Sequence, residues 1–295
     1  MDIVNKVRNQ PLPGETIQSL GTAYSPGGKG ANQAIAAHLL GEKVSMVGAV
    51  GQDGFGEQLL SNFQKCGLET KHIYAKDSNS GTAFITIDEQ GENQIIISAG
   101  ANGKLNIEDV GEILCKDDWD TVLLQNEISW NVTAYVIEEA SRRGMKVAFN
   151  PAPAIKISKD ILSLIDLLIL NETETEYITG IEVSDRSSAL KAAQSIIRSG
   201  VKEVIITLGN KGVLYFNCHQ EEVFQSAFSV KVVDTTAAGD TFLGAFMAAR
   251  RNAYTTKDCL TFACAAAALA VTKQGAQNSI PTFQEVTEFL KVPGT

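Results

Sequence analysis

Short apolar segments alternate along the chain with amphipathic segments that end in glycine. The apolar segments predict buried strands at residues 44–50, 121–124, 146–149, 167–170 and 203–208. The amphipathic segments predict helices at residues 55–66, 106–114, 132–143 and 186–199, and a further helix that ends at Gly180. Strands that are apolar throughout are typical of a sheet buried on both faces. The pattern therefore predicts an α/β fold, in which helices cover both faces of a mostly parallel central sheet.

Two regions do not follow this alternation. Residues 82–88 and 93–98 flank a Glu-Gln-Gly-Glu turn and predict a β-hairpin, while residues 2–26 predict short, partly alternating strands around a turn at Pro11–Gly14. We expect these strands to form a small β-sheet lid over the carboxyl ends of the core strands, where open α/β sheets bind ligands. The expected lid comprises residues 1–26 and 81–98, and the expected core comprises residues 27–80 and 99–295.

Composition narrows the class of protein. The 295 residues are 44% hydrophobic and 20% charged, which is ordinary for a globular protein, and the net charge of −9 argues against nucleic acid or an anionic membrane as the main partner. Five cysteines without a C-x-x-C pair suit reduced thiols better than a disulfide framework. The first residues lack the apolar core of a signal peptide, and the uncharged run at residues 259–272 is too short to span a bilayer. We therefore predict a cytoplasmic protein.

The most informative segment is Asp234-Thr235-Thr236-Ala237-Ala238-Gly239-Asp240-Thr241-Phe242. The β-branched run before it, at residues 230–233, predicts a strand, and the small apolar residues after it predict a helix. The small side chains of Ala237, Ala238 and Gly239 would let an anion approach their backbone N–H groups at the positive end of that helix.

Asp240 would lie in the first turn of the same helix, beside the bound anion. A carboxylate beside an anion is electrostatically unfavourable, so its presence suggests a function. It could act as a general base that removes the proton from a hydroxyl as that hydroxyl attacks a phosphoryl group. The alternative is that Asp240 only stabilises the helix dipole and that the small residues only pack closely.

A second glycine-rich segment, Pro26-Gly27-Gly28-Lys29-Gly30-Ala31-Asn32-Gln33, opens an alanine-rich helix that ends near Gly41. Its glycines indicate a backbone that bends sharply or lies against a ligand. The segment is neither a Walker A loop nor a dinucleotide fingerprint, because the spacing of both motifs fails. A nicotinamide-dependent dehydrogenase is therefore disfavoured.

Polar residues also follow several of the predicted strands. Asn171 and Glu174 could bind nucleotide phosphates and magnesium, or could be an N-cap and an acidic residue that favours the helix dipole. Glu127 could point into the same crevice or could be an exposed loop carboxylate. Thr207 and Gly209 follow another strand, where the glycine could serve only as a turn.

Taken together, these motifs resemble those of the ribokinase (PfkB) family of sugar and nucleoside kinases, and the ribokinase branch in particular. D-T-T-A-A-G-D-T-F, G-G-K-G-A-N, N-E-T-E, N-P-A-P-A at residues 150–154 and A-G-A-N at residues 99–102 occur in the family's order over essentially the whole chain. The family usually has glycine where Ala237 stands. The resemblance implies ATP-dependent phosphorylation of D-ribose at the 5-hydroxyl, which gives D-ribose 5-phosphate and ADP.

The resemblance also implies roles for individual residues. Asp240 would be the catalytic base, and the N–H groups of Ala237, Ala238 and Gly239 would form the anion hole. The sugar would be bound by Asp2, Gly28, Lys29, Gly30, Asn32, Glu127 and Asp240. The nucleotide would contact Asn171, Glu174, Thr207 and Gly209, with Mg²⁺ near Glu174, directly or through water. A potassium ion or similar monovalent cation would be held by Asp234, Thr236, Ala270, Lys273, Gly275 and Ser279. A homodimer through the lid is expected on the same ground.

The resemblance is incomplete at the first residues. Family members open with an apolar strand and a G-S-x-N-x-D-like turn, whose Asn and Asp bind the sugar. Asp2 matches that Asp, whereas the Asn and the strand have no counterpart. We therefore expect either that the sequence starts too far downstream or that the protein is a shortened form. Neighbouring strands would then expose apolar faces and unpaired backbone groups. A 2-deoxyribokinase, another sugar kinase of the family, and a non-catalytic sugar- or nucleotide-binding relative remain as alternatives.

Overall fold

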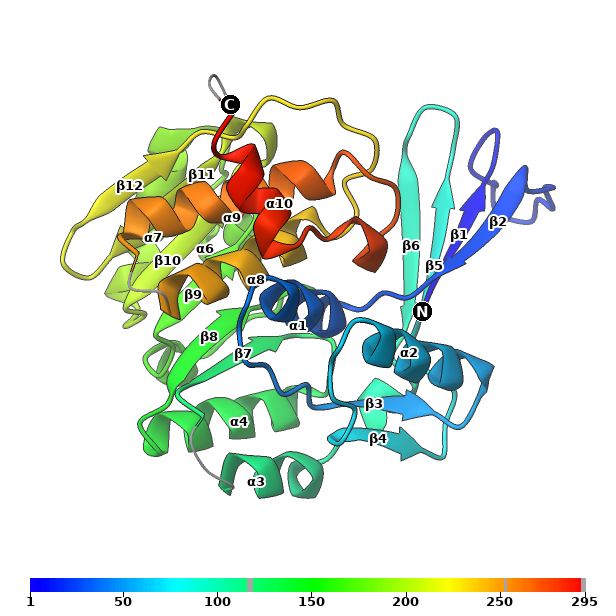
Figure 1. Cartoon of the computed structure of the whole chain (residues 1–295), viewed down its shortest axis with the longest axis horizontal. Coiled ribbons are helices and arrows are strands. Elements are labelled where there is room, and N and C mark those ends of the chain that lie inside the picture. Colours follow the sequence, from blue (N-terminus) through cyan, green and yellow to red (C-terminus); the bar gives the residue numbers. More distant parts are fainter. Residues whose placement is uncertain (116–118, 252–253, 293–295) are drawn as a thin grey trace.

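Helices and strands alternate through most of the chain in a computed structural model, which describes residues 1–115, 119–251 and 254–292 (Figure 1). The strands are β1 (Asp2–Lys6), β2 (Gly21–Ser25), β3 (Gly48–Gly51), β4 (Ile73–Lys76), β5 (Thr82–Ile87), β6 (Asn93–Ser98), β7 (Thr121–Gln125), β8 (Lys146–Asn150), β9 (Leu167–Leu170), β10 (Glu203–Thr207), β11 (Val213–Asn217) and β12 (Glu222–Gln225). The helices are α1 (Lys29–Leu39), α2 (Gly54–Lys65), α3 (Ile107–Cys115), α4 (Trp130–Arg142), α5 (Lys159–Leu162), α6 (Glu172–Thr179), α7 (Arg186–Arg198), α8 (Ala238–Arg251), α9 (Thr256–Ala270) and α10 (Phe283–Phe289). Short 3-10 turns lie at Gly100–Lys104, Gly209–Lys211 and Gln277–Ser279.

The largest sheet has six strands in the order β12-β11-β10-β9-β8-β7. Strands β7 to β10 run parallel to one another, as the helix–strand alternation predicts. β11 and β12 were not predicted, and they add an antiparallel edge to the sheet. The expected class is confirmed: an α/β fold with a mostly parallel sheet between two layers of helices.

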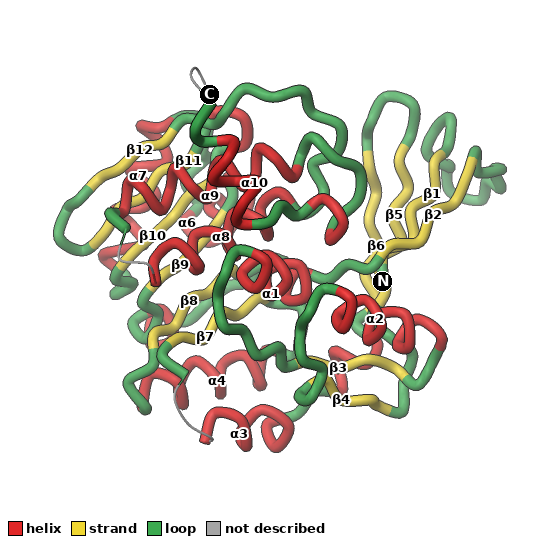
Figure 2. Tube along the Cα trace, viewed as in Figure 1, coloured by secondary structure: helices red, strands yellow, loops and turns green. Residues whose placement is uncertain are grey.

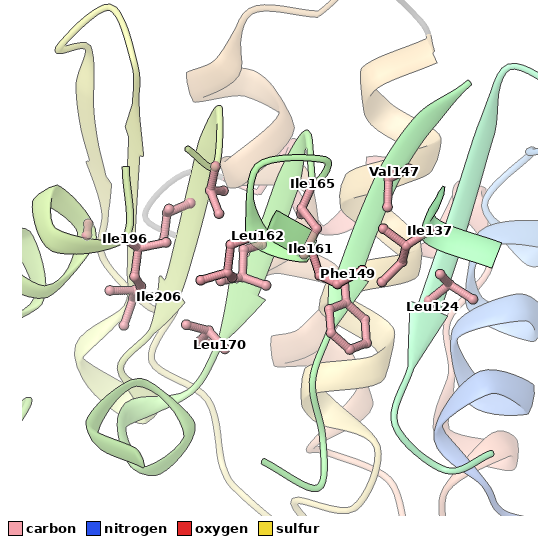
Figure 3. Close-up of a cluster of buried hydrophobic side chains, with 14 of the residues drawn as sticks. Leu124, Ile137, Val147, Phe149, Ile161, Leu162, Ile165, Leu170, Ile196 and Ile206 are labelled. Carbon is pink, nitrogen blue, oxygen red and sulfur yellow. The ribbon is translucent and has the colours of Figure 1, made fainter. Parts of the chain in front are cut away.

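Alternate residues of the central strands supply the cores on the two faces of this sheet. Leu168 and Leu170 of β9 join a buried cluster with side chains of α3, α4, α5 and α7. Leu167 and Ile169 of the same strand pack instead with α8, α9 and α10. Side chains of a strand point to opposite faces in turn, so a strand that is apolar at every position requires both helical layers. Figure 3 shows part of the first cluster, around Phe149 of β8.

A second sheet of four strands, in the order β2-β1-β5-β6, stands to one side of the core (Figure 2). β5 and β6 pair antiparallel with Ile85 opposite Ile95, which confirms the predicted hairpin. All four strands fall within the residues assigned to the lid, while the division into lid and core stays a prediction. The sheet carries exposed apolar residues, among them Ile96, whose side chain is 71% exposed.

A cavity separates the remaining strands from the central sheet. β3 and β4 form a parallel pair of their own, and the expected strand at residues 44–50 is confined to Gly48–Gly51. Between β3 and β7 lies a cavity of about 770 Å³, lined by apolar residues of both strands and of α1, α3 and α4. Within the described ranges, no strand pairs with the edges of β3 and β7 that border it. Apolar side chains of both strands therefore line the cavity instead of packing against a strand between them.

The expected strand at residues 230–233 is wrong. The segment is irregular, and Val232 and Val233 are 58% and 56% exposed. Its backbone does not join a sheet, since the N–H of Val233 donates to the carbonyl of Val271 at the end of α9, at 2.8 Å. β-Branched residues favour a strand only where a neighbouring strand is available to pair.

The helices of the described residues do not include one that is long and apolar enough to cross a membrane.

Candidate active site

The predicted site residues gather where four parallel strands end. Glu127 follows β7, Asn171 follows β9, and Thr207 is the last residue of β10. The first turns of α1 and α8 reach the same edge of the sheet and bring Lys29 and Asp240 to it. Ligands of open α/β sheets bind outside the carboxyl ends of the strands, so the arrangement is that of a binding crevice.

The glycines before and within the first turn of α1 make room for polar side chains. Gly28 has a φ of 98°, a conformation that other residues rarely adopt, and it lies just before the helix. A Cβ atom on Gly27 would lie 2.1 Å from Oδ2 of Asp2, and one on Gly30 would lie 2.8 Å from Oε1 of Gln125. The loop therefore bends sharply and also lies close against acidic and amide groups.

Lys29 is a cation that acts on every carboxylate of the crevice. Burial raises the pKa of four carboxyl groups, those of Asp2, Glu127, Asp240 and Glu174. The positive charge of Lys29 opposes this rise in pKa at each of them. The carboxylates also raise one another's pKa, as Asp240 does for Glu127. Such a concentration of like charges is typical of functional sites, because a structural core would avoid it.

Glu127 is not an exposed loop carboxylate. Its Oε2 accepts a 2.7 Å hydrogen bond from the backbone N–H of Lys29. Asn126, beside it, donates its side-chain amide to the carbonyl of Pro153 at 2.7 Å, which ties this turn to the Asn-Pro-Ala-Pro-Ala segment. Glu127 thus faces the glycine-rich loop, as a residue of the crevice should.

Asp240 lies in the first turn of α8, as predicted, and the structure adds that it is buried. Its Oδ2 accepts from Nδ2 of Asn32 at 2.9 Å, and its Oδ1 accepts from Nε2 of Gln33 at 2.8 Å. Burial raises the pKa of Asp240, while Lys29 and these two amides lower it in part. The close approach of the two helices is possible because Gly244, one turn after Asp240, packs on α1: a Cβ atom there would lie 2.5 Å from Cβ of Ala36.

The turn before α8 differs in one respect from the predicted anion hole. The N–H of Ala238 donates to the carbonyl of Thr235 at 3.2 Å, so this donor is already engaged within the turn. The N–H groups of Ala237 and Gly239 have no acceptor among the described residues. Ala237 has a φ of 60°, in the left-handed region that favours glycine.

Asn171 and Glu174 form a capping box at the start of α6. The Asn171 side chain accepts from the N–H of Glu174 at 2.8 Å, and Oε2 of Glu174 accepts from the N–H of Asn171 at 3.0 Å. The structural interpretation of the pair is therefore correct. Oε1 of Glu174 has no hydrogen bond to the described residues, so one carboxylate oxygen could still bind a metal ion, and the contacts with nucleotide stay a prediction.

The other two residues expected at the nucleotide lie at the end of β10. Thr207 donates its hydroxyl to the carbonyl of Leu170 at 3.4 Å, and Gly209 opens a 3-10 turn with a φ of 53°. Gly209 thus adopts a turn conformation, as the simpler interpretation expects. Its role toward nucleotide stays a prediction.

Three of the residues expected to hold a monovalent cation are joined directly. Oδ1 of Asp234 accepts from the backbone and the hydroxyl of Thr236, and Oδ2 accepts from the N–H of Gly275 at 2.9 Å. Burial raises the pKa of Asp234, but these hydrogen bonds outweigh it and leave the pKa below its usual value. The carboxylate therefore stays ionised, which suits a cation.

The other three expected cation ligands lie in the segment that follows. The carbonyl of Ala270 accepts from the N–H of Lys273 at 3.2 Å, and the buried hydroxyl of Ser279 donates to the carbonyl of Ala276. Carbonyl and carboxylate oxygens are the donors that a hard cation prefers, so the set fits one. Within the described part of the chain, no group of three or more His, Cys, Asp or Glu residues has the arrangement of a metal site.

Four buried or half-buried amides of the site have no role predicted from the sequence, those of Gln33, Gln125, Asn150 and Gln277. Their amides surround Asp240 and Asn32: Gln277 donates to Oδ1 of Asn32 at 3.0 Å, and Gln125 donates to Oε1 of Gln33 at 2.6 Å. One signal was available, because Gln33 is a polar residue within an otherwise alanine-rich buried helix face.

Comparison with known proteins agrees with this geometry. The model of the pfkB family carbohydrate kinase matches residues 1–283. The chain is 41% identical to the ribokinase of Haemophilus influenzae over 95% of this chain and 92% of that protein. It is 33% identical to the deoxyribokinase of Salmonella typhi over 99% and 96% of the two chains. The structure of Arabidopsis thaliana ribokinase complexed with ribose and ATP matches with a TM-score of 0.90 and 32% identity, over 99% of this chain and 96% of that one.

Proposed function

The chain belongs to the pfkB family of carbohydrate kinases, and from this premise we propose that it transfers the γ-phosphoryl group of ATP to the 5-hydroxyl of D-ribose. The observation that carries the proposal is the placement of Asp240. A buried carboxylate lies in the first turn of a helix, oriented by two amides and faced by a lysine. A general base for a hydroxyl nucleophile requires such an orientation.

The sugar would lie between the glycine-rich loop and the first residue of the lid sheet. Asp2 and Glu127 would accept hydrogen bonds from its hydroxyls, while Lys29 and Asn32 would donate to them. Gly28 and Gly30 would let the ring approach the backbone. Asp240 would then take the proton of the 5-hydroxyl as the oxygen attacks the γ-phosphorus. The bond between the γ-phosphorus and the β–γ bridging oxygen would break, and ADP would leave.

The transferring phosphoryl group would lie at the start of α8. The N–H groups of Ala237 and Gly239 would donate to its oxygens, and that of Ala238 would do so only after leaving Thr235. Asn171, Thr207 and Gly209 would contact the nucleotide. Mg²⁺ would be held near Glu174, where its charge would stabilise the phosphate oxygens.

A monovalent cation such as K⁺ would be held beside the turn that precedes α8. Asp234 and Thr236 would supply side-chain oxygens, and residues 270–279 would supply backbone and hydroxyl oxygens. Such an ion would order the anion-binding turn without taking part in proton transfer.

We further propose a homodimer through the lid sheet and a cytoplasmic location. The edge strand β6 exposes Ile95, Ile96 and Ile97, which are costly in water and would be covered by a second copy. All five cysteines are free, which suits a reducing compartment. Sedimentation of wild type and of Ile96→Glu tests the dimer, because a charge in the contact should leave a monomer.

The decisive test of the function is ADP release by the chain with Mg-ATP and K⁺, compared for D-ribose, 2-deoxyribose and no sugar. Release with ribose alone is the expected result. Release that is stronger with 2-deoxyribose would favour the activity named for the Salmonella relative. A folded protein that binds ribose without releasing ADP would instead be a non-catalytic relative.

A further inference from the structure

Gln33 connects the catalytic base to the rest of the buried polar network. Its side chain is 1% exposed, and both N–H groups of its amide are in use. One donates to Oδ1 of Asp240 at 2.8 Å and the other to Oδ1 of Asn150 at 3.3 Å. Its carbonyl oxygen accepts from Gln125 at 2.6 Å. The orientation of this amide is therefore determined on every side.

The chain of hydrogen bonds from Asp240 through Gln33 continues beyond Asn150 to Glu174, the expected magnesium site. Nδ2 of Asn150 donates to the carbonyl of Ile169 at 3.0 Å and, more weakly, to Oε2 of Glu174 at 3.5 Å. Two neutral amides, Gln33 and Asn150, thus lie between two carboxylates of like charge. Each presents donors toward the carboxylate it faces, which stabilises both anions in a buried place.

We propose that Gln33 is a positioning residue for Asp240, and that Asn150 links Gln33 to Glu174 through hydrogen bonds. This rests on the proposed function, in which Asp240 is the base. With Asn32 on one oxygen and Gln33 on the other, the carboxylate cannot rotate, and the remaining lone pairs of both oxygens stay available to the sugar hydroxyl. A donor on each oxygen also favours the ionised form that a base must have.

Several charged groups act on Asp240 besides these amides. Lys29 of α1 favours the ionised form of Asp240. Three carboxyl groups also face it, those of Asp2 of β1, Glu127 after β7 and Glu174 of α6, and the charge of Asp240 raises the pKa of each. Removing the Gln33 donors leaves all four in place. A change in the ionisation of Asp240 would then report the loss of the amide itself.

The test compares Gln33→Met with wild type by two measurements. Methionine has a similar length and volume without a donor, and Gln125→Met is the matched control, because Gln125 bonds to Gln33 but not to Asp240. The first measurement is the pH dependence of kcat and kcat/KM for ribose. The second is an infrared titration of the Asp240 carboxyl, identified by the band that disappears in Asp240→Asn.

We expect Gln33→Met to raise the pKa of Asp240 in both measurements and to lower kcat by about tenfold or more, with a much smaller change in KM. Gln125→Met should titrate like wild type. If Gln33→Met fails to fold, Gln33→Asn keeps an amide that is one methylene too short to reach Asp240 and should raise the same pKa.

A folded Gln33→Met in which Asp240 titrates as in wild type would overturn the proposal. So would an equal rise in Gln125→Met, because it would indicate a general loosening of the core. The infrared titration does not require turnover, so it still decides the role of Gln33 if wild type releases no ADP. Failure of the proposed function is thereby separate from failure of this inference.

Discussion

The backbone N–H of Lys29 donates a 2.7 Å hydrogen bond to Oε2 of Glu127, which joins the start of α1 to the end of β7. The bond places a carboxylate in a crevice that already holds three others with raised pKa values. The fold therefore holds these four carboxyl groups together against electrostatic repulsion.

Glu127→Gln should raise thermal stability at neutral pH, by about 1–3 °C. Burial raises the pKa of Glu127, so the ionised form costs free energy in the folded state. Glutamine keeps the acceptor for Lys29 and removes that cost. The gain should be complete above the raised pKa and should disappear as the pH falls toward the usual glutamate value of 4.5.

Glu139→Gln is a control, because the pKa of Glu139 is shifted in the opposite direction to that of Glu127. Hydrogen bonds from Arg142 and Arg143 lower the pKa of Glu139 to about 2, so its charge is favoured in the folded state. Melting curves from pH 4 to pH 8 should show no gain for this variant. A gain in both variants would mean that net charge, rather than the crevice, governs the effect.

Asp240→Asn should lower kcat by about 10²–10⁴-fold, the usual contribution of a general base, and should leave ribose binding largely intact. Turnover assays and calorimetric titration with ribose measure the two effects. Because the pKa of Asp240 is raised by burial, kcat/KM of wild type should fall on the acid side at a higher pH than an ordinary aspartate would give. Turnover at the wild-type rate in Asp240→Asn would exclude this residue as the base.

Ala237→Gly should stabilise the protein by about 1 kcal/mol, because glycine adopts the left-handed conformation without the clash of a Cβ atom. Chemical denaturation measures the difference. Ala238→Gly is the matched control: Ala238 begins α8, and glycine there should destabilise by about 0.5–1 kcal/mol. Equal effects at both positions would contradict the assignment of strain to Ala237.

Gly244→Ala should destabilise the protein by about 1–3 kcal/mol and should also lower kcat, because a Cβ atom would push α1 away from α8. Asn32 and Gln33 lie on α1 and Asp240 lies on α8, so the three would separate together. Gly111→Ala in α3 is the control, since a Cβ atom there meets only the hydroxyl of Tyr135, at 3.5 Å. It should stabilise, as alanine favours a helix more than glycine does.

Most of the site could be predicted because its residues are local to strand ends and helix starts. The glycine-rich loop and the turn before Asp240 are contiguous motifs, and the structure brings both to one edge of the sheet. The contact between Gln33 and Asp240 joins residues 207 positions apart, and such a contact has no periodic pattern in the sequence.

The errors in the fold have a similar cause. The valines before Asp234 have strand-like side chains but no strand beside them, while Val213–Asn217 pairs antiparallel with β10. The spacing of apolar residues indicates the type of element and its buried face. It does not indicate which strand will pair with it or in which direction the two will run.

The cavity between β3 and β7 has a consequence for cooperativity. Backbone hydrogen bonds connect β7 to β12 without interruption, but within the described residues none cross from β7 to β3. Helix packing and a few side-chain hydrogen bonds, such as that of Lys76 with Asp109, couple the β3–β4 pair to the rest. α1 belongs to that coupling because its alanines join the same buried cluster as Val50. We therefore expect amide hydrogens of β3 and β4 to exchange with deuterium sooner than those of β8 to β10. The glycine-rich loop before α1, where we propose that the sugar binds, would then loosen at a lower temperature than the central sheet.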